Sequence, residues 1–231
     1  MNNGIRIFIG LLLTMLWSWY GFVVQNFKQV GRQQPEKLIT GEIFPTGRSG
    51  TAQFGQEVYQ ANGCAACHTM QVRPQGHGAD IERGWGKRNT VLRDFVHDEH
   101  VFLGQTRIGP DLAGIGTRQY ATRDWHLAHL WNPRTVVKGS LMPQYPYLFE
   151  VRKMLGGRPS PKALSVAPEF RKDVPEGYEI VPTREAEALV EYLRSLQSDV
   201  RLFEAPIITN APAGSVTQQA APADAAASTN Q

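Results

Sequence analysis

The 231-residue sequence has only two cysteines, and this scarcity excludes several classes of protein. A disulfide-rich secreted scaffold needs several cysteine pairs. A structural zinc site would need a second ligand pair, and neither another CxxC nor an HxxxH accompanies Cys64 and Cys67. A thioredoxin-like redox pair would lie in a βαβ pattern, which the sequence lacks.

Runs of one charge are also absent. The 24 Lys and Arg residues and the 21 Asp and Glu residues give a net charge of +3, and the basic residues are dispersed along the chain. We therefore expect no nucleic-acid partner.

The motif that is present is Cys64-Ala65-Ala66-Cys67-His68. Two thiols separated by two residues, with a histidine directly after the second, form the spacing for covalent attachment of haem c. One turn of chain presents both sulfurs to the two vinyl groups of a porphyrin, and His68 then faces the iron. The motif predicts one haem c, linked by thioether bonds to Cys64 and Cys67.

One long hydrophobic run occurs, from Ile7 to Val24, and it contains no charge. Its 18 residues would form about 27 Å of helix at ~1.5 Å per residue, close to the thickness of a hydrocarbon core. A cleaved signal peptide would have a shorter apolar region and a small-x-small cleavage site, which the sequence after Tyr20 lacks. We therefore expect residues 1–27 to be an uncleaved transmembrane anchor.

Two signals disagree about the orientation of this anchor. Lys28, Arg32 and Lys37 follow the span and only Arg6 precedes it, which favours a cytoplasmic C-terminal side. Covalent haem attachment in bacteria takes place outside the cytoplasmic membrane. Because the charge difference is small and the motif is specific, we expect a cytoplasmic N-terminus and a haem domain on the periplasmic or outer face of the inner membrane.

The remaining sequence predicts a mainly α fold, with helices wrapped around the covalently attached haem and long loops between them. We expect a linker over residues 28–50, a monohaem cytochrome c domain over 51–204 and a disordered tail over 205–231, where charges and aromatic residues are almost absent. The segment 156–182 is rich in proline and has no clear placement.

Four helices are expected in the cytochrome domain from cap residues and apolar spacing. The first is capped by Ser49 or Thr51 and ends near Asn62-Gly63, and the second is capped by Asp124 and ends before Pro133. A third, short helix is expected over Phe149 to Leu155. The last is capped by Thr183, carries an apolar stripe and should cross the first beside the haem.

Few residues of the sequence are candidates for binding the haem iron. In c-type cytochromes the carbonyl of a proline placed like Pro110, in Gly109-Pro110-Asp111-Leu112, accepts the ring N–H of the iron-bound histidine, here His68. Of the five methionines, Met1 and Met15 lie in or before the membrane span, and Met70 is too close to His68 to reach the opposite face of the haem. Met142, in a proline-bounded loop, is preferred to Met154 as the sixth ligand, because a His/Met pair suits electron transfer.

The other histidines give weaker signals. His97 and His100 are expected in a solvated loop, and His77 has no identifiable partner. His126 and His129 lie three residues apart on the expected second helix. We interpret them as structural or interface residues, because a metal site would need further ligands.

The order CxxCH, GPDL and then WHxxHLxxPRxVxxxSxMPxYP resembles the membrane-anchored monohaem subunit, subunit II, of cbb3-type cytochrome c oxidases. The resemblance covers about residues 5–150 and includes Arg73-Pro74 after the haem motif. It implies that the haem c passes electrons from a dihaem c-type cytochrome subunit to the haem b of a haem-copper catalytic subunit. Lys138, where the family usually has proline, and the segment from Met154 to Pro182 depart from the family pattern.

Two alternatives remain open at this point. The small subunit of bacterial nitric-oxide reductase is also an anchored monohaem cytochrome c. A haem-based enzyme or gas sensor would instead need an open iron position, with His126 or His129 above it. Both cysteines are taken and no cysteine-rich loop remains for copper, so oxygen reduction would occur in another subunit and this chain would have no catalytic centre of its own.

Overall fold

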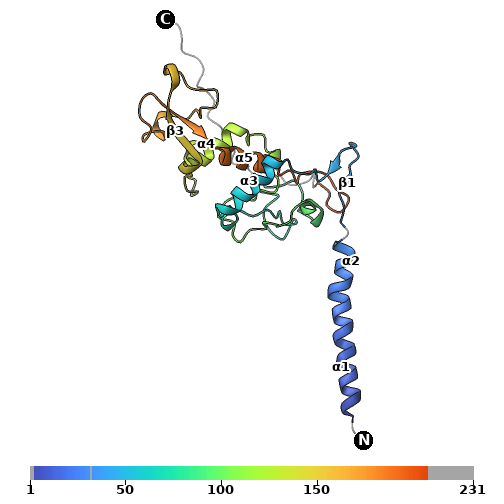
Figure 1. Cartoon of the computed structure of the whole chain (residues 1–231). Helices are drawn as coiled ribbons and strands as arrows, with labels where there is room; N and C mark the ends of the chain where they lie inside the picture. The colour runs from blue at the N-terminus through green and yellow to red at the C-terminus, as the bar shows by residue number, and fades with distance from the viewer. Residues whose placement is uncertain (1–2, 32, 208–231) are drawn as a thin grey trace. The chain divides into compact units, whose positions relative to one another are not determined.

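The computed structural model describes residues 3–31 and 33–207 of the chain (Figure 1). The residues divide into two compact units. The first contains the chain up to Thr46 together with Val91–Glu99, and the second contains Gly47–Thr90 and the chain from His100 onward.

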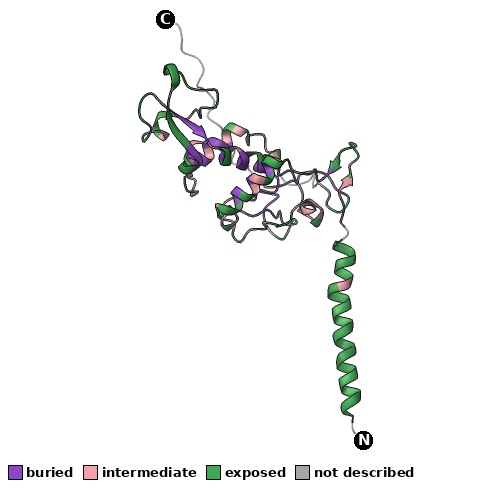
Figure 2. Ribbon diagram, in the orientation of Figure 1, coloured by how far each residue is buried: buried purple, intermediate pink, exposed green. Residues whose placement is uncertain are grey.

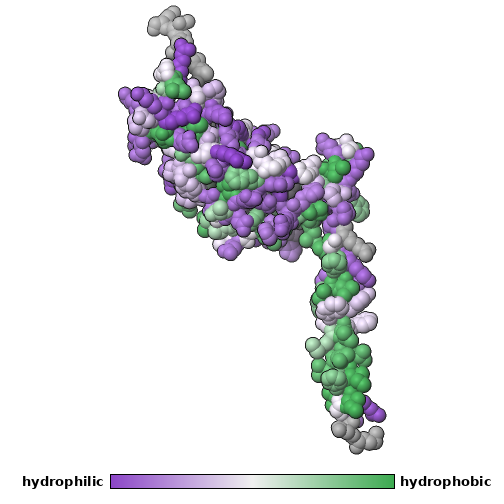
Figure 3. Space-filling model, viewed as in Figure 1, coloured by the Kyte–Doolittle hydropathy of each residue, from purple (hydrophilic) through white to green (hydrophobic). Residues whose placement is uncertain are grey.

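The first unit begins with a continuous helix from Gly4 to Val30. It consists of α1 (Gly4–Trp19), a π-helical turn η1 (Tyr20–Gln25) and α2 (Asn26–Val30). Nearly every residue is exposed, and its visible face is dominated by apolar side chains (Figures 2 and 3). Its 27 residues span roughly 40 Å, so the helix is long and apolar enough to cross a membrane once, which indicates a single-pass anchor. It extends the predicted span by a few residues at each end.

The rest of the first unit is small. The antiparallel strands β1 (Glu36–Lys37) and β2 (Ile43–Phe44) form a short ribbon, and the turn η3 (Leu92–Phe95) belongs to the same unit. His97 Nε2 donates a hydrogen bond to the Pro45 carbonyl at 3.0 Å. Within the described residues no group of three or more His, Cys, Asp or Glu residues is placed to hold a metal ion.

In the second unit, α3 (Gly50–Ala61) crosses α5 (Arg184–Ser195) at close range. A Cβ atom added to Gly55 would lie 1.9 Å from the Ala188 carbonyl oxygen and 2.8 Å from Tyr192 Cβ. Only glycine permits this backbone approach. Both helices begin as predicted, with the hydroxyls of Ser49 and Thr183 accepting hydrogen bonds from the backbone N–H groups three residues later.

Helix α4 (Arg123–Trp131) begins two residues earlier than a cap at Asp124 would allow. The cap is Thr122, whose Oγ1 accepts from the Trp125 N–H at 3.2 Å, so the prediction of Asp124 as the cap was wrong. Asp124 lies in the first turn, where its negative charge favours the helix N-terminus and pairs with Arg123 at 2.8 Å. The helix ends before Pro133, as predicted.

The prediction of a helix over Phe149–Leu155 was also wrong. Strand β3 (Phe149–Lys153) pairs antiparallel with β4 (Tyr178–Pro182), with Phe149 opposite Pro182 and Lys153 opposite Tyr178. The buried Glu179 carboxylate binds Arg152 at 2.8 Å across the strands. The segment 156–182 is therefore the long connection of a hairpin, followed by its second strand.

Short 3₁₀ turns make up the other regular structure of the second unit, at Cys64–Ala66 (η2), Ile115–Thr117 (η4), Pro133–Thr135 (η5), Pro146–Leu148 (η6), Leu155–Gly157 (η7) and Pro168–Phe170 (η8). One apolar core joins α3, α4, α5 and the hairpin. Leu202 and Ala205 are buried, so ordered packing reaches the predicted start of the tail at residue 205. Most of that tail, 208–231, lies outside the described residues.

Candidate haem site

The two cysteines lie on one tight turn directly after α3. Gly63 adopts φ of +66°, a conformation that favours glycine, and reverses the chain into η2. The N–H groups of Cys67 and His68 both donate to the Cys64 carbonyl, at 3.2 and 3.0 Å. Both thiols are free, and burial raises the pKa of Cys64 to about 11. The turn thus presents two free thiols and an imidazole together.

The ring of His68 is held in one tautomer. Its Nδ1 lies 2.8 Å from the Pro110 carbonyl oxygen. A carbonyl only accepts, so Nδ1 carries the proton and Nε2 keeps a free lone pair. Burial lowers the pKa of His68, the Pro110 hydrogen bond partly opposes this, and the nearby Arg118 charge lowers it further. The predicted hydrogen bond is thus present, and the neutral ring can bind a metal through Nε2.

Two glycines allow the chain to pack directly on His68. A Cβ atom at Gly109 would lie 2.3 Å from His68 Cε1 and 2.9 Å from Nε2. Gly104, with φ of +85°, would place a Cβ atom 2.2 Å from the His68 carbonyl oxygen. Any side chain at either position would displace the histidine.

The segment 103–112 is tied to the haem motif along its length. Four backbone hydrogen bonds join the two segments: Met70 N–H to Leu103 O, Gln105 N–H to Ala65 O, Gly109 N–H to Cys67 O and Leu112 N–H to Thr69 O. Asp111 is fully buried and accepts from Thr69 Oγ1, the Gln71 N–H and the Ala113 N–H at 2.6 to 2.9 Å. These bonds fix the carbonyl of Pro110 beside His68.

Met142 is partly buried against the apolar core, in the loop between α4 and β3. Its N–H donates to Ser140 Oγ at 3.3 Å, and the Tyr145 N–H donates to the Leu130 carbonyl at 3.0 Å. The loop is also tied to the end of α3, because the Tyr147 hydroxyl donates to Asn62. The methionine-bearing loop and the cysteine turn are therefore fastened to each other, and iron ligation by Met142 stays a prediction.

The other methionine near the motif is already engaged. Met70 is buried, and its sulfur accepts a hydrogen bond from the Tyr192 hydroxyl at 3.5 Å. Met154 begins the hairpin connection, and its N–H donates to the Gly177 carbonyl at 2.8 Å. The choice of Met142 over Met154 stays a prediction.

Helix α4 carries an aromatic group around its two histidines. Trp125 stacks on His129, with ring centroids 4.8 Å apart and planes 8° apart, and contacts His126 edge-on at 5.3 Å. Burial lowers the pKa of each histidine to about 4, and the charges of neighbouring cationic groups add to this effect. Both rings are therefore neutral near pH 7. His126 Nε2 and His129 Nδ1 are buried and have no hydrogen-bond partner.

These residues fit a covalently attached haem. Two free thiols and one lone pair on His68 Nε2 occur together on one turn. In the comparison with known families, residues 48–157 match the family described as cytochrome c oxidase, mono-heme subunit/FixO. This cytochrome domain belongs to the mono-haem FixO family. No curated protein matches the chain significantly.

The match over residues 48–157 supports a mono-haem subunit of cytochrome c oxidase, an oxidoreductase complex of the respiratory chain. It implies one haem c and a catalytic partner subunit. The match begins at residue 48, just before α3, and ends at residue 157, the last residue of η7. Strand β4 and helix α5 lie outside the matched residues.

The structure also shows a buried charge network that sequence reasoning missed. Asp80 is fully buried and binds Arg73 through both carboxylate oxygens, at 2.9 and 3.1 Å. Arg107 lies 2.9 Å from the same carboxylate, and its other nitrogen donates to the Gln71 carbonyl. The network joins the chain that follows His68 to the segment 103–112. Only Arg73 had a sequence signal, through the family resemblance.

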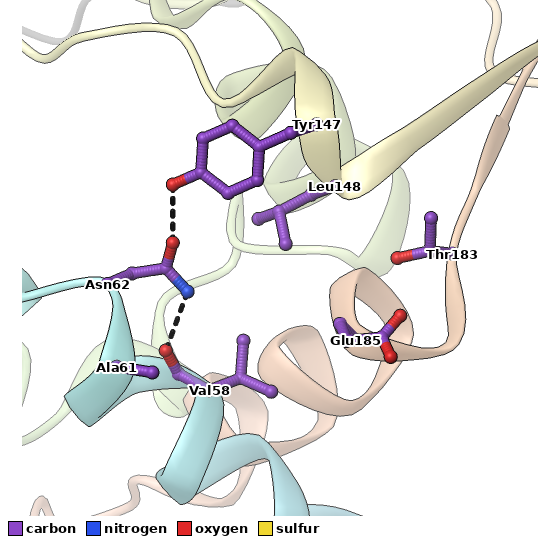
Figure 4. Close-up of a pocket in the computed structure, with 7 residues that line it drawn as sticks. All are labelled: Val58, Ala61, Asn62, Tyr147, Leu148, Thr183 and Glu185. Carbon is purple, nitrogen blue, oxygen red and sulfur yellow. Dashed lines mark hydrogen bonds between the residues drawn. The ribbon is translucent and has the colours of Figure 1, made fainter.

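A small cavity of about 260 Å³ lies beside the end of α3 (Figure 4). Its lining residues are Val58, Ala61, Asn62, Tyr147, Leu148, Thr183 and Glu185. Asn62 bridges its wall by donating to the Val58 carbonyl at 2.7 Å and accepting from Tyr147. Neither cysteine nor His68 lines this cavity, so it lies beside the haem motif and does not include it.

Proposed function

We propose that this chain relays single electrons within a cytochrome c oxidase and has no catalytic centre of its own. Cys64 and Cys67 would hold the haem through thioether bonds, and His68 Nε2 and the Met142 sulfur would bind its iron. The bound haem supplies one-electron redox chemistry, and His/Met ligation raises its reduction potential toward electron transfer. The electrons would pass to the haem-copper catalytic subunit from a dihaem c-type cytochrome.

One observation carries this proposal most directly. The Pro110 carbonyl, 2.8 Å from His68 Nδ1, leaves the lone pair of Nε2 free on a turn that also bears two free thiols. A structural disulfide needs no such control of the adjacent imidazole. A metal-binding histidine does, because its second nitrogen sets the tautomer, the ring orientation and the basicity of the ligand.

The two residues proposed to bind the iron would also exclude other ligands from it. With His68 and Met142 both holding the iron, no position on it would remain for oxygen or carbon monoxide. We further propose that the N-terminus is cytoplasmic and that the cytochrome domain lies on the periplasmic side, where covalent attachment takes place.

Substitution of Met142 tests the relay directly. The purified Met142→Ala chain should keep its covalent haem, lose the methionine–iron absorption band and bind carbon monoxide when reduced. Met154→Ala is the matched control and should behave like the wild type. A Met142→Ala chain with an unchanged spectrum would show that another residue is the sixth ligand, and carbon monoxide binding by the wild type would favour a ligand-binding haem protein.

A further inference from the structure

The linker that follows the membrane helix is bound by a loop of the cytochrome sequence. This loop, residues 91–99, lies within the matched family segment but belongs to the same compact unit as the linker. Arg93 Nη1 donates to the Gln34 carbonyl at 2.6 Å, and Arg93 Nε lies 3.4 Å from a Glu36 carboxylate oxygen. The Arg93 side chain is only 18% exposed, so solvent and salt screen this ion pair less than one on the open surface.

The same loop also binds the far end of the β1–β2 ribbon. His97 Nε2 donates to the carbonyl of the buried Pro45 at 3.0 Å. Gln34 precedes β1 and Pro45 follows β2, so loop 91–99 holds the ribbon at both ends. We call these contacts of Arg93 and His97 with the linker the clasp.

The chain between the membrane helix and the clasp is short. The helix ends at Val30, the Gln33 N–H donates to the Val30 carbonyl at 3.2 Å, and Gln34 is the next residue. The path from Val30 to Gln34 spans at most about 14 Å when fully extended. A free linker over residues 31–49 would instead span about 65 Å when extended and about 25 Å on average as a flexible coil.

We infer that Arg93 and His97 are positioning residues, which hold the cytochrome domain at a short reach from the membrane anchor. Loop 91–99 is continuous with the domain at both of its ends, so the bonds that hold the loop also restrain the domain. This inference rests on the proposed relay, whose haem must stay near its electron acceptor because electron tunnelling slows steeply with distance. The linker predicted over residues 28–50 is then a restrained connection and not a flexible tether.

Two insertions of the same flexible sequence, Gly-Gly-Ser-Gly-Gly-Ser, test the inference in the full-length protein. One follows Gly31, between the helix and the clasp, and the other follows Thr46, beyond the clasp. The readout is the electron paramagnetic resonance spectrum of the ferric haem in oriented phospholipid bilayers. This spectrum depends on the angle between the bilayer and the magnetic field only if the haem keeps a fixed orientation relative to the membrane.

The wild type and the Thr46 insertion should show this angular dependence, and the Gly31 insertion should lose it. The Arg93→Gln/His97→Leu double variant should lose it as well, while its absorption spectrum and reduction potential stay unchanged. Arg158→Gln, at an exposed arginine outside the clasp, is the matched control and should behave like the wild type.

Three results would overturn the inference: equal responses to the two insertions, a double variant that keeps the wild-type angular dependence, or a wild type that shows none. A free linker predicts equal responses, because both insertions lengthen it by the same amount. Each of these results can occur in a protein with its haem attached. A chain that never acquires covalent haem would instead overturn the proposed function.

Discussion

Gly109 is the residue on which the placement of the His68 ring depends most closely. Gly109→Ala would bring a methyl group to 2.3 Å from His68 Cε1, so the ring or the loop must move. Overpacking of this kind costs about 1–3 kcal/mol. We expect a lower free energy of unfolding in urea and a perturbed haem spectrum.

Gly47→Ala is the matched control, because a Cβ atom there would meet nothing within 4 Å. It should leave both properties close to the wild type. Equal stability of the two variants would contradict the close packing of Gly109 on His68.

Asp80 gives a prediction about pH. Burial raises the pKa of Asp80, but its hydrogen bonds and charge contacts with Arg73 and Arg107 outweigh burial and lower it overall. A lowered pKa in the folded state contributes stability above the ordinary Asp pKa of about 3.9, and this contribution is lost as the pH falls through the folded-state value. Asp80→Asn should cost about 3 kcal/mol at pH 7, because it leaves two arginines facing a neutral group.

The check is urea unfolding of the wild type and Asp80→Asn from pH 7 to pH 3. The difference between their free energies of unfolding should be largest at neutral pH and should shrink below about pH 4. Asp111, whose pKa burial raises, contributes in the opposite sense in both chains. A difference that does not vary with pH would contradict an ionised Asp80.

Residues with local chemical signals could be predicted from the sequence, whereas those defined by distant contacts could not. The spacing of the haem motif identified the cysteines and His68, and Pro110 followed from the motif after it. Asp80 lies seven residues from Arg73 but far from Arg107, and no periodic pattern marks a carboxylate that both will bind. Its burial depends on a loop path that the sequence does not reveal locally.

At the scale of elements, the crossing of α3 and α5 holds the second unit together. Gly55→Ala should lower the free energy of unfolding by about 2 kcal/mol or more, because its methyl group would overlap the Ala188 carbonyl and Tyr192. Gly50→Ala, in the first turn of the same helix, meets nothing within 4 Å and should be neutral or slightly stabilising. The free energies of unfolding of both variants, measured in urea, test this prediction. Equal values would contradict the close crossing of α3 and α5.

The helices were predictable because their caps and apolar faces are local. The hairpin could not be predicted in this way. The segment from Phe149 to Leu155 has mixed apolar and charged residues that fit a short helix, and its strand conformation depends on pairing with Tyr178–Pro182. That partner lies about 25 residues later, beyond a proline-rich connection, so neither segment alone indicates that the two strands pair.

At the scale of the whole molecule, the sequence predicted an anchor followed by a cytochrome domain. The structure places the segment Val91–Glu99 with the N-terminal unit, although it lies within the predicted domain of residues 51–204. Long-range contacts explain the difference, because Arg93 binds Glu36 at 3.4 Å and His97 binds the Pro45 carbonyl. No composition change marks this segment.

The central claim is that one haem is covalently attached to Cys64 and Cys67. The most direct measurement is the intact mass of the denatured chain purified from membranes, combined with titration of its free thiols. We predict the polypeptide mass increased by one haem and no reactive thiol. A chain of unmodified mass, with two thiols that react freely, would contradict the claim.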